Sequence, residues 1–180
     1  DRRTISLDSV FTRVGPRDFG RIAQEISDAS VTLLRNDRKV IPFSPSSRVI
    51  VVAVTEDPSP AISTDFVEEL LPATGTVGLI RVSNDTGRER FAAIRDSARG
   101  ADVMVVGIYL SVVAWKGERR FAPPLADFLA SLPNVGTPVV IVAYGDPYVL
   151  GKVPLTAGAM TPFNGTRLAE ISVARALTGR

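Results

Sequence analysis

The sequence predicts a flavodoxin-like α/β fold, a three-layer α/β/α sandwich built on a mainly parallel sheet of about five strands. Short apolar runs rich in β-branched residues recur along the chain, and segments with helical spacing follow them. Strands that alternate with helices form parallel sheets whose faces the helices cover. With 180 residues, of which 45% are hydrophobic, the chain is long enough for one domain with a core of its own.

The expected strands are the apolar runs. The run "RVIVVAV" at 48–54 is typical of a strand buried on both faces, because polar residues do not alternate with the apolar ones. Further strands are expected at 76–82, 102–110 and 138–145, with a short one at 157–163 and an extended segment at 30–37. The runs at 49–54, 103–109 and 138–144 are the most uniformly apolar, so we expect them inside the sheet and away from its edges.

The expected helices are amphipathic segments between these runs. From Arg17 onward, apolar residues recur at helical spacing, namely Phe19, Ile22, Ala23, Ile26 and Ala29. Further helices are expected at 63–71, 88–98, 124–132 and 166–179. Ser63 or Thr64 is the expected N-cap of the second helix, and Thr166 and Gly179 are the expected cap and stop of the last. We assign residues 1–22 to a linker and the start of the first helix, and residues 23–180 to the domain.

The composition excludes several classes of function. The chain has no cysteine and no histidine, which removes Cys/His zinc sites, cysteine nucleophiles and Ser-His-Asp triads. A formal net charge of +2 does not make a basic face, so we expect no nucleic-acid partner. No apolar run reaches the length of a membrane span, so we expect no membrane partner. No strand end carries the glycine pattern of a nucleotide-binding loop.

Acidic residues follow three of the expected strands. Asp57, Asp85 and Asp146 lie in loops that a parallel sheet brings to one edge, where carboxylates are able to hold Mg²⁺ as in receiver domains. The alternative is that each Asp forms a turn or caps the next helix. Asp57 and Asp146 each precede a proline, which favours the turn.

Three segments, in the same order, resemble the C-terminal α/β sandwich domain of glycoside hydrolase family 3. "AQEISDASVTLLRNDRKVIPF", 23–43, resembles the start of that domain, a helix ending in Ala-x-x-Ser-x-x-Leu-Leu-(Lys/Arg)-Asn before a turn. "VVIVAYGDPYVLG", 139–151, resembles its strand followed by Gly-Asn-Pro-Tyr, with Asp146 in place of the Asn. "AEISVARALTGR", 169–180, is similar to its helix ending Ala-x-x-x-Leu-x-Gly. The resemblance covers nearly the whole chain from about Ala23.

The resemblance implies that the chemistry lies on another domain. The family's nucleophile is an aspartate on an N-terminal (β/α)₈ barrel, which these 180 residues do not contain. The family domain usually continues past its last helix, so we expect this chain to be a piece of a longer protein. A retaining glycosidase also needs two carboxyl groups flanking one bond, and no single strand-end loop here offers such a pair.

The resemblance also bears on the segment "VVAWKGERRFAPP", 112–124. In β-glucosidase-like members, a Glu in the loop after the third strand is the acid/base, often within Glu-Gly-x-Asp-Arg. Here "KGERR" has Lys116 in the place of that Glu and Arg119 in the place of the Asp, and Glu118 falls at the variable position. N-acetylglucosaminidase-like members carry an Asp-His acid/base pair on a barrel loop instead. The missing Glu favours that branch, with the β-glucosidase type as the alternative.

We therefore expect an accessory domain of a β-N-acetylhexosaminidase-like enzyme, with a barrel of the same protein and a carbohydrate as its partners. We expect no catalytic residue, metal or cofactor in this chain, and a periplasmic or extracellular location. Trp115 is a candidate to stack on a sugar, and Lys116, Glu118 and Arg119 are candidates to hydrogen-bond to it. The alternative for this loop is packing against the barrel or solvation. Nearby cations lower the pKa of a carboxyl group, so Glu118 is not expected to be a general acid.

A second hypothesis is a stand-alone binding module of the flavodoxin-like or receiver-like type. Receiver chemistry needs a lysine at a late strand end, and the late lysine here, Lys152, lies well past Asp146. Binding of Mg²⁺, a nucleotide or a flavin would distinguish this module from an accessory domain.

Overall fold

A six-stranded sheet forms the centre of the molecule. The computed structural model describes residues 7, 9–10, 14–55, 61–110 and 121–180. The sheet has the order β1-β6-β5-β4-β2-β3, and each pair is parallel except β1 with β6. The strands are β1 (Thr32–Arg35), β2 (Arg48–Thr55), β3 (Thr76–Val82), β4 (Val103–Leu110), β5 (Val139–Gly145) and β6 (Gly158–Thr161).

The sheet confirms the prediction of a mainly parallel α/β architecture. The three most apolar runs, now β2, β4 and β5, all lie inside the sheet, and β1 and β3 are its edges. The extended segment predicted at 30–37 contains the additional strand, because β1 pairs with the short strand β6 in antiparallel register, with Thr32 opposite Thr161.

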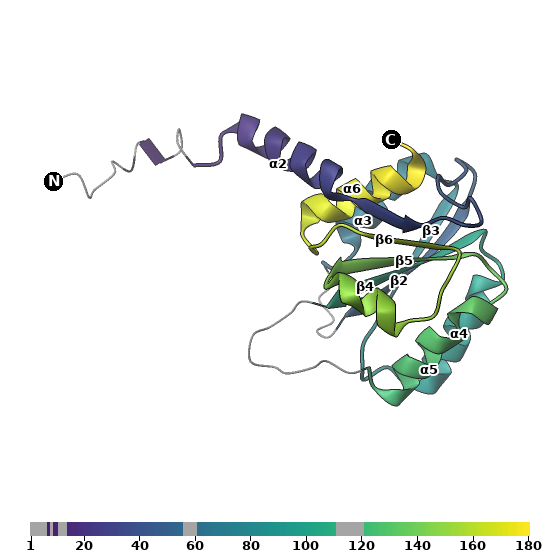
Figure 1. The fold of residues 1–180 in the computed structure, drawn as a ribbon. Helices are drawn as coiled ribbons and strands as arrows, with labels where there is room; N and C mark the ends of the chain where they lie inside the picture. The colour runs from purple at the N-terminus through teal and green to yellow at the C-terminus, as the bar shows by residue number, and fades with distance from the viewer. Residues whose placement is uncertain (1–6, 8, 11–13, 56–60, 111–120) are drawn as a thin grey trace.

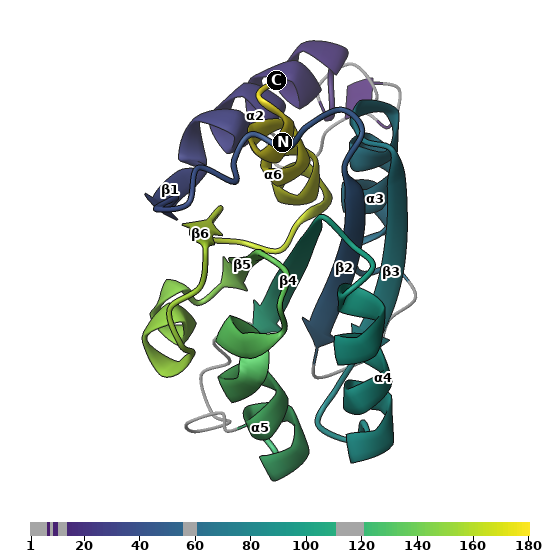
Figure 2. The same ribbon diagram turned by 90° about the vertical axis from the view of Figure 1, so that its right-hand side faces the viewer.

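Helices cover both faces of the sheet (Figure 2). The helices are α2 (Arg17–Ser30), α3 (Thr64–Leu70), α4 (Arg88–Ala98), α5 (Pro123–Ser131) and α6 (Arg167–Thr178). Helices α4 and α5 lie on one face, and α3 and α6 lie on the other, with α2 packed outside α6 (Figures 1 and 2). Among the described residues, no helix is both long and apolar enough to cross a membrane.

The alternation of side chains along each strand divides the core into two layers. Val52 and Met104 point toward α4 and α5, where the rings of Phe91 and Phe128 stack with centroids 4.9 Å apart. The neighbouring residue Val51 joins the layer beneath α3 and α6. Successive strand residues face opposite sides, so a strand covered on both faces has to be apolar throughout.

Two of the predicted helix ends are confirmed, and one cap differs. The Thr166 hydroxyl accepts a hydrogen bond from the amide N of Ala169 at the start of α6, and Gly179 ends that helix with φ +73°. Ser63 precedes α3, but its side chain does not cap that helix. Glu170, a residue distant in sequence, accepts the hydrogen bonds at the start of α3 instead.

Helix α2 is amphipathic, but it packs on the domain with its polar side. The Gln24 amide N lies 2.8 Å from the Ser172 hydroxyl of α6, and that hydroxyl lies 2.7 Å from Asp28 Oδ1. Arg175 of α6 pairs with Asp28 at 3.4 Å. Phe19, Ile22 and Ile26 are exposed. We call these three residues the α2 apolar face.

Candidate functional site at the carboxyl edge of the sheet

The carboxyl ends of the parallel strands meet at one edge of the sheet, which we call the carboxyl edge. Ligands of open α/β sheets bind at this edge, because the loops that follow the strands converge there. Val82 and Gly145 are followed by described residues that lead into α4 and a short 3₁₀ helix, Pro147–Lys152, and after Leu110 the described residues resume at Phe121, just before α5. The residues that follow β6 lead into α6 at the same edge.

A buried carboxylate, Glu170, organises the inner part of this edge. Glu170 lies in the first turn of α6 and is 4% exposed. One of its oxygens, Oε1, accepts hydrogen bonds from the amide N of Ser63 at 2.9 Å and the Tyr109 hydroxyl at 2.9 Å. The other accepts from the amide N of Phe66 at 3.2 Å. Glu170 therefore caps α3 from another helix and ties α3, α6 and β4 together.

This arrangement explains why Ser63 does not cap its own helix. Ser63 adopts φ +63°, and its hydroxyl lies 2.7 Å from the Tyr109 hydroxyl. The Glu170 carboxylate satisfies the first amides of α3 in its place, and a negative charge is favourable at a helix N-terminus.

Two stacked tyrosines lie beside Glu170. The rings of Tyr109 and Tyr144, on the paired strands β4 and β5, have centroids 4.3 Å apart and are inclined by 9°. Gly107 gives them room, since a Cβ there would lie 3.1–3.2 Å from the two rings. The Tyr144 hydroxyl is buried and has no hydrogen-bond partner among the described residues.

The electrostatics of this cluster suit structure better than catalysis. Burial raises the pKa of Glu170, although hydrogen bonds from Ser63, Tyr109 and Phe66 oppose the shift. Burial and the neighbouring Glu170 charge also raise the pKa values of Tyr109 and Tyr144. Glu170 is enclosed and its oxygens are occupied by protein donors, which is the arrangement of a structural cap.

Asn84 connects two loops of the carboxyl edge. Its side-chain oxygen accepts a hydrogen bond from the amide N of Ala122 at 2.8 Å, just before α5 begins. The turn that carries Asn84 is closed by the Thr86 hydroxyl, which accepts from the amide N of Ser83 at 2.9 Å. The end of the segment between β4 and α5 is thereby held beside the loop between β3 and α4.

Asp146 has the turn-forming role that the sequence favoured. Its carboxylate accepts a hydrogen bond from the amide N of Tyr148 at 2.9 Å and so caps the 3₁₀ helix after β5. Of the other two candidate carboxylates for Mg²⁺, Asp85 is described and Asp57 lies outside the described residues. Within the described ranges, no three acidic side chains group closely enough to hold a metal ion.

Two exposed aromatic residues lie on the outer part of the edge. Tyr148 follows β5 and is 82% exposed, and Phe163 follows β6 and is 52% exposed. Phe163 has φ +63°, a backbone conformation that bulky residues rarely adopt. This conformation belongs to the turn between β6 and α6, where the amide N of Phe163 donates to the Thr161 hydroxyl at 3.1 Å.

The four candidate contact residues from the sequence, Trp115, Lys116, Glu118 and Arg119, lie outside the described residues. Their roles therefore stay predictions. Sequence reasoning missed Glu170, although a signal was present. Glu170 falls on the apolar stripe of its helix together with Val173, Ala174 and Leu177, and a charged residue in such a stripe needs buried partners. Tyr148 and Phe163 carried no comparable signal.

This chain resembles known proteins in its three-dimensional structure. Neither the models of known protein families nor the curated protein sequences give a match. Among solved structures, a glycoside hydrolase family 3 β-N-acetylglucosaminidase from Paenibacillus sp. superposes with a TM-score of 0.73 and 17% identity, over 98% of this chain and 32% of its own. A β-glucosidase from Listeria innocua gives a TM-score of 0.75 and 16% identity, over 98% of this chain and 27% of its own. This chain has a fold that occurs as part of family 3 enzymes.

The likeness confirms the fold predicted from the family resemblance. A third structure, a fungal multi-domain family 3 β-N-acetylglucosaminidase, superposes with a TM-score of 0.74 at 16% identity, over 97% of this chain and 19% of its own. The chain thus spans about a third or less of the proteins whose fold it shares. Because a glucosaminidase and a glucosidase superpose about equally well, overall shape does not choose between the two branches.

Proposed function

We propose that this chain is the accessory C-terminal domain of a family 3 glycoside hydrolase and supports a sugar site on a separate (β/α)₈ barrel. The fold, shared over nearly the whole chain with a part of family 3 enzymes, is the observation that carries the proposal. The β-N-acetylhexosaminidase branch is favoured because Lys116 occupies the position where glucosidase-type members have the acid/base Glu. The chain supplies contacts to the sugar, and the barrel supplies the nucleophile.

The α2 apolar face supports the presence of a partner domain. Phe19 is 59% exposed, Ile22 42% and Ile26 66%, while the polar side of the same helix packs on α6. An amphipathic helix normally buries its apolar stripe. Covering the exposed parts of these three side chains would contribute about 3 kcal/mol. We assign this face to the barrel, since the proteins that share the fold have long additional chain.

The orientation of α2 agrees with this assignment. Its first turns project past the N-terminal end of α6, on the side of the carboxyl edge (Figure 1). The first turns of α2 and the carboxyl edge therefore lie on the same side of the domain, and we assign both to contact with one barrel. Tyr148 and Phe163 join Trp115 as candidates to contact the sugar or the barrel rim, because aromatic side chains combine large contact area with few rotatable bonds.

The first experiment compares residues 1–180 alone with a polypeptide that carries the same residues after the barrel encoded in the same reading frame. Both are assayed with nitrophenyl N-acetylglucosaminide and nitrophenyl glucoside. The isolated chain should release no nitrophenol, and the longer polypeptide should prefer the glucosaminide. A reading frame without a barrel, or turnover by residues 1–180 that is lost on mutating one of them, would overturn the proposal. A thermal shift with Mg²⁺, nucleotides or flavin would support the stand-alone module instead.

The second experiment tests the docking face. Ile26→Asp should leave the melting temperature of the isolated chain nearly unchanged, because the side chain is already exposed there. In the longer polypeptide, the same change should lower kcat/KM and increase proteolysis between the domains. Leu71→Asp is the matched control, since Leu71 is 47% exposed but follows α3 at the opposite edge of the sheet. Equal effects of the two changes would remove α2 from the interface.

A further inference from the structure

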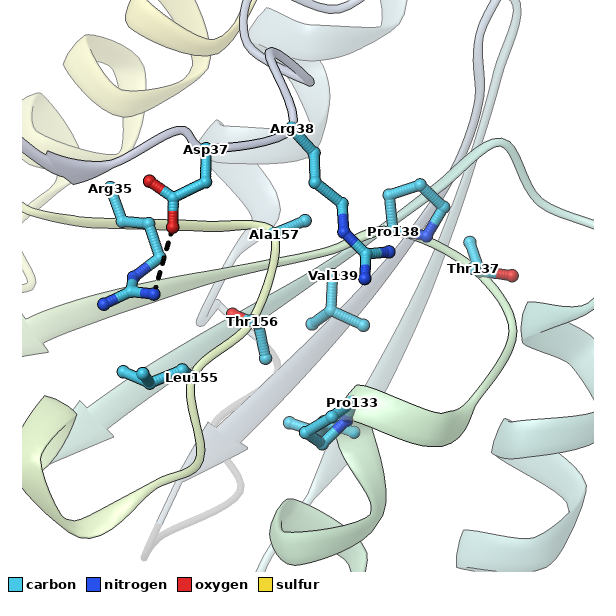
Figure 3. Close-up of a pocket in the computed structure, with 11 residues that line it drawn as sticks. Arg35, Asp37, Arg38, Pro133, Thr137, Pro138, Val139, Leu155, Thr156 and Ala157 are labelled. Atoms are coloured by element: carbon cyan, nitrogen blue, oxygen red, sulfur yellow. Dashed lines mark hydrogen bonds and ion pairs between the residues drawn. The ribbon is translucent and has the colours of Figure 1, made fainter.

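A pocket with a volume of about 220 Å³ opens at the amino edge of the sheet, opposite the carboxyl edge (Figure 3). It lies between the end of β1 with the turn after it, the 3₁₀ helix Leu132–Asn134 that follows α5, the start of β5 and the segment before β6. Leu132, Val139, Leu155 and Ala157 form the apolar part of its lining, and polar groups make up the larger part. The proposed function uses none of these residues.

The rim of this pocket carries a net positive charge. Three charged side chains line it, Arg35, Arg38 and Asp37. Arg35 Nη1 pairs with Asp37 Oδ2 at 3.1 Å. Arg38 makes no hydrogen bond or ion pair within the described part of the chain, and Figure 3 shows its guanidinium directed over Val139. The charged side chains that line the pocket therefore carry a net charge of +1, contributed by Arg38.

The turn that carries Arg38 is held by its own hydrogen bonds. The Asn36 side chain donates to the carbonyl of Ile41 at 2.7 Å and accepts from the amide N of the same residue at 3.1 Å. The amide N of Lys39 donates to the carbonyl of Asn36 at 3.0 Å. A fixed turn lowers the entropy that binding has to overcome, although the Arg38 side chain itself must still be ordered.

The remaining polar groups of the pocket offer few donors. The Thr137 hydroxyl donates to the carbonyl of Ala98 at 2.6 Å, and the Thr156 hydroxyl donates to the carbonyl of Gly158 at 3.0 Å. Donors to a ligand therefore come mainly from the two guanidinium groups. A second hollow of about 130 Å³ shares Arg35, Leu155 and Thr156 with the first, and apolar side chains such as Leu34 and Leu150 dominate its lining.

We propose that this pocket binds a small organic monoanion, a carboxylate attached to a compact apolar body. A guanidinium group matches a carboxylate in two parallel hydrogen bonds, so the arginines at the rim would hold the carboxylate. The single unpaired charge favours a monoanion over a dianion. The apolar body extends into the adjoining hollow, whose lining is mostly apolar. The volume is below that of sites for drug-sized ligands, so the ligand is small.

The test is a titration of ¹⁵N-labelled residues 1–180 with benzoate, followed by NMR and calorimetry. Saturable shifts should concentrate in residues 35–38, 132–139 and 155–157. Arg38→Gln should weaken binding about tenfold or more, because it removes a charge-assisted contact. Arg88→Gln is the matched control, since Arg88 is an exposed arginine at the start of α4 and lies at the other edge of the sheet.

Two further ligands define the chemical class. Benzamide has the same body without the charge and should not bind, and inorganic phosphate should bind more weakly than benzoate. Absence of saturable benzoate binding, equal binding by Arg38→Gln and Arg88→Gln, or equal binding of benzamide or phosphate would each overturn the inference. None of these results bears on the accessory-domain proposal, because that proposal concerns the opposite edge of the sheet.

Discussion

Replacing Glu170 by alanine should destabilise the domain more than the loss of an ordinary helical glutamate. The change removes the acceptor of three hydrogen bonds, from the amides of Ser63 and Phe66 and from the Tyr109 hydroxyl. One of these donors is the amide N of Ser63 at the N-cap of α3, and another is the amide N of Phe66 in its first turn; the Ser63 side chain does not cap the helix. Two buried backbone amides therefore lose their acceptor, and the Tyr109 hydroxyl keeps only its contact with the Ser63 hydroxyl.

The size of the effect follows from these contacts. Each lost hydrogen bond costs about 1 kcal/mol, and the space left by the side chain adds about 1 kcal/mol. Relief of the buried charge offsets part of this sum, because burial raises the pKa of Glu170 and so disfavours the carboxylate. We expect a net loss of about 3 kcal/mol in the free energy of unfolding. For a domain of this length the melting temperature should fall by roughly 6–12 °C.

The assay is urea unfolding of residues 1–180 followed by circular dichroism. An unchanged slope of the free energy of unfolding against urea concentration checks that the variant still unfolds in two states. Glu89→Ala is the matched control. Glu89 is an exposed carboxylate in the first turn of α4, and its loss should change stability by less than about 0.5 kcal/mol. If Glu170→Ala costs less than about 1 kcal/mol, the carboxylate is not the cap of α3 and the reasoning is wrong.

Three other outcomes follow from the same structure. Because the pKa of Glu170 is raised in the folded chain, the unfolded chain loses this proton first, so the free energy of unfolding should fall as pH rises from the ordinary glutamate pKa through the raised value; Glu170→Gln should remove this dependence in pH-dependent urea melts. Tyr144→Phe should be neutral or stabilising by up to about 1 kcal/mol, since its hydroxyl lacks a partner among the described residues, whereas Tyr109→Phe should cost about 1 kcal/mol. In a barrel-containing polypeptide, Glu118→Gln should change kcat/KM slightly and equally for good and poor leaving groups, and selective slowing of the poor ones would identify Glu118 as the general acid.

Local patterns were sufficient to determine the architecture of this protein. The uniformly apolar runs that became β2, β4 and β5 have to be covered on both faces, and that requirement places them inside a sheet between helices. Thr166 and Gly179 act through their own neighbouring backbone, so the limits of α6 were also readable. The order of the motifs along the chain was enough to indicate a family 3 fold, which the structural comparison confirms.

Contacts between residues distant in sequence were decided only in the tertiary structure. Glu170 caps a helix that begins more than a hundred residues earlier, and the Ser63 hydroxyl turns to Tyr109 as a result. The exposure of the α2 apolar face likewise depends on which side of α2 meets α6, and helical periodicity gives a stripe without saying what covers it. The pocket at Arg38 combines four separate segments of chain. Sequence patterns report short-range geometry, whereas these features arise from packing that brings remote segments together.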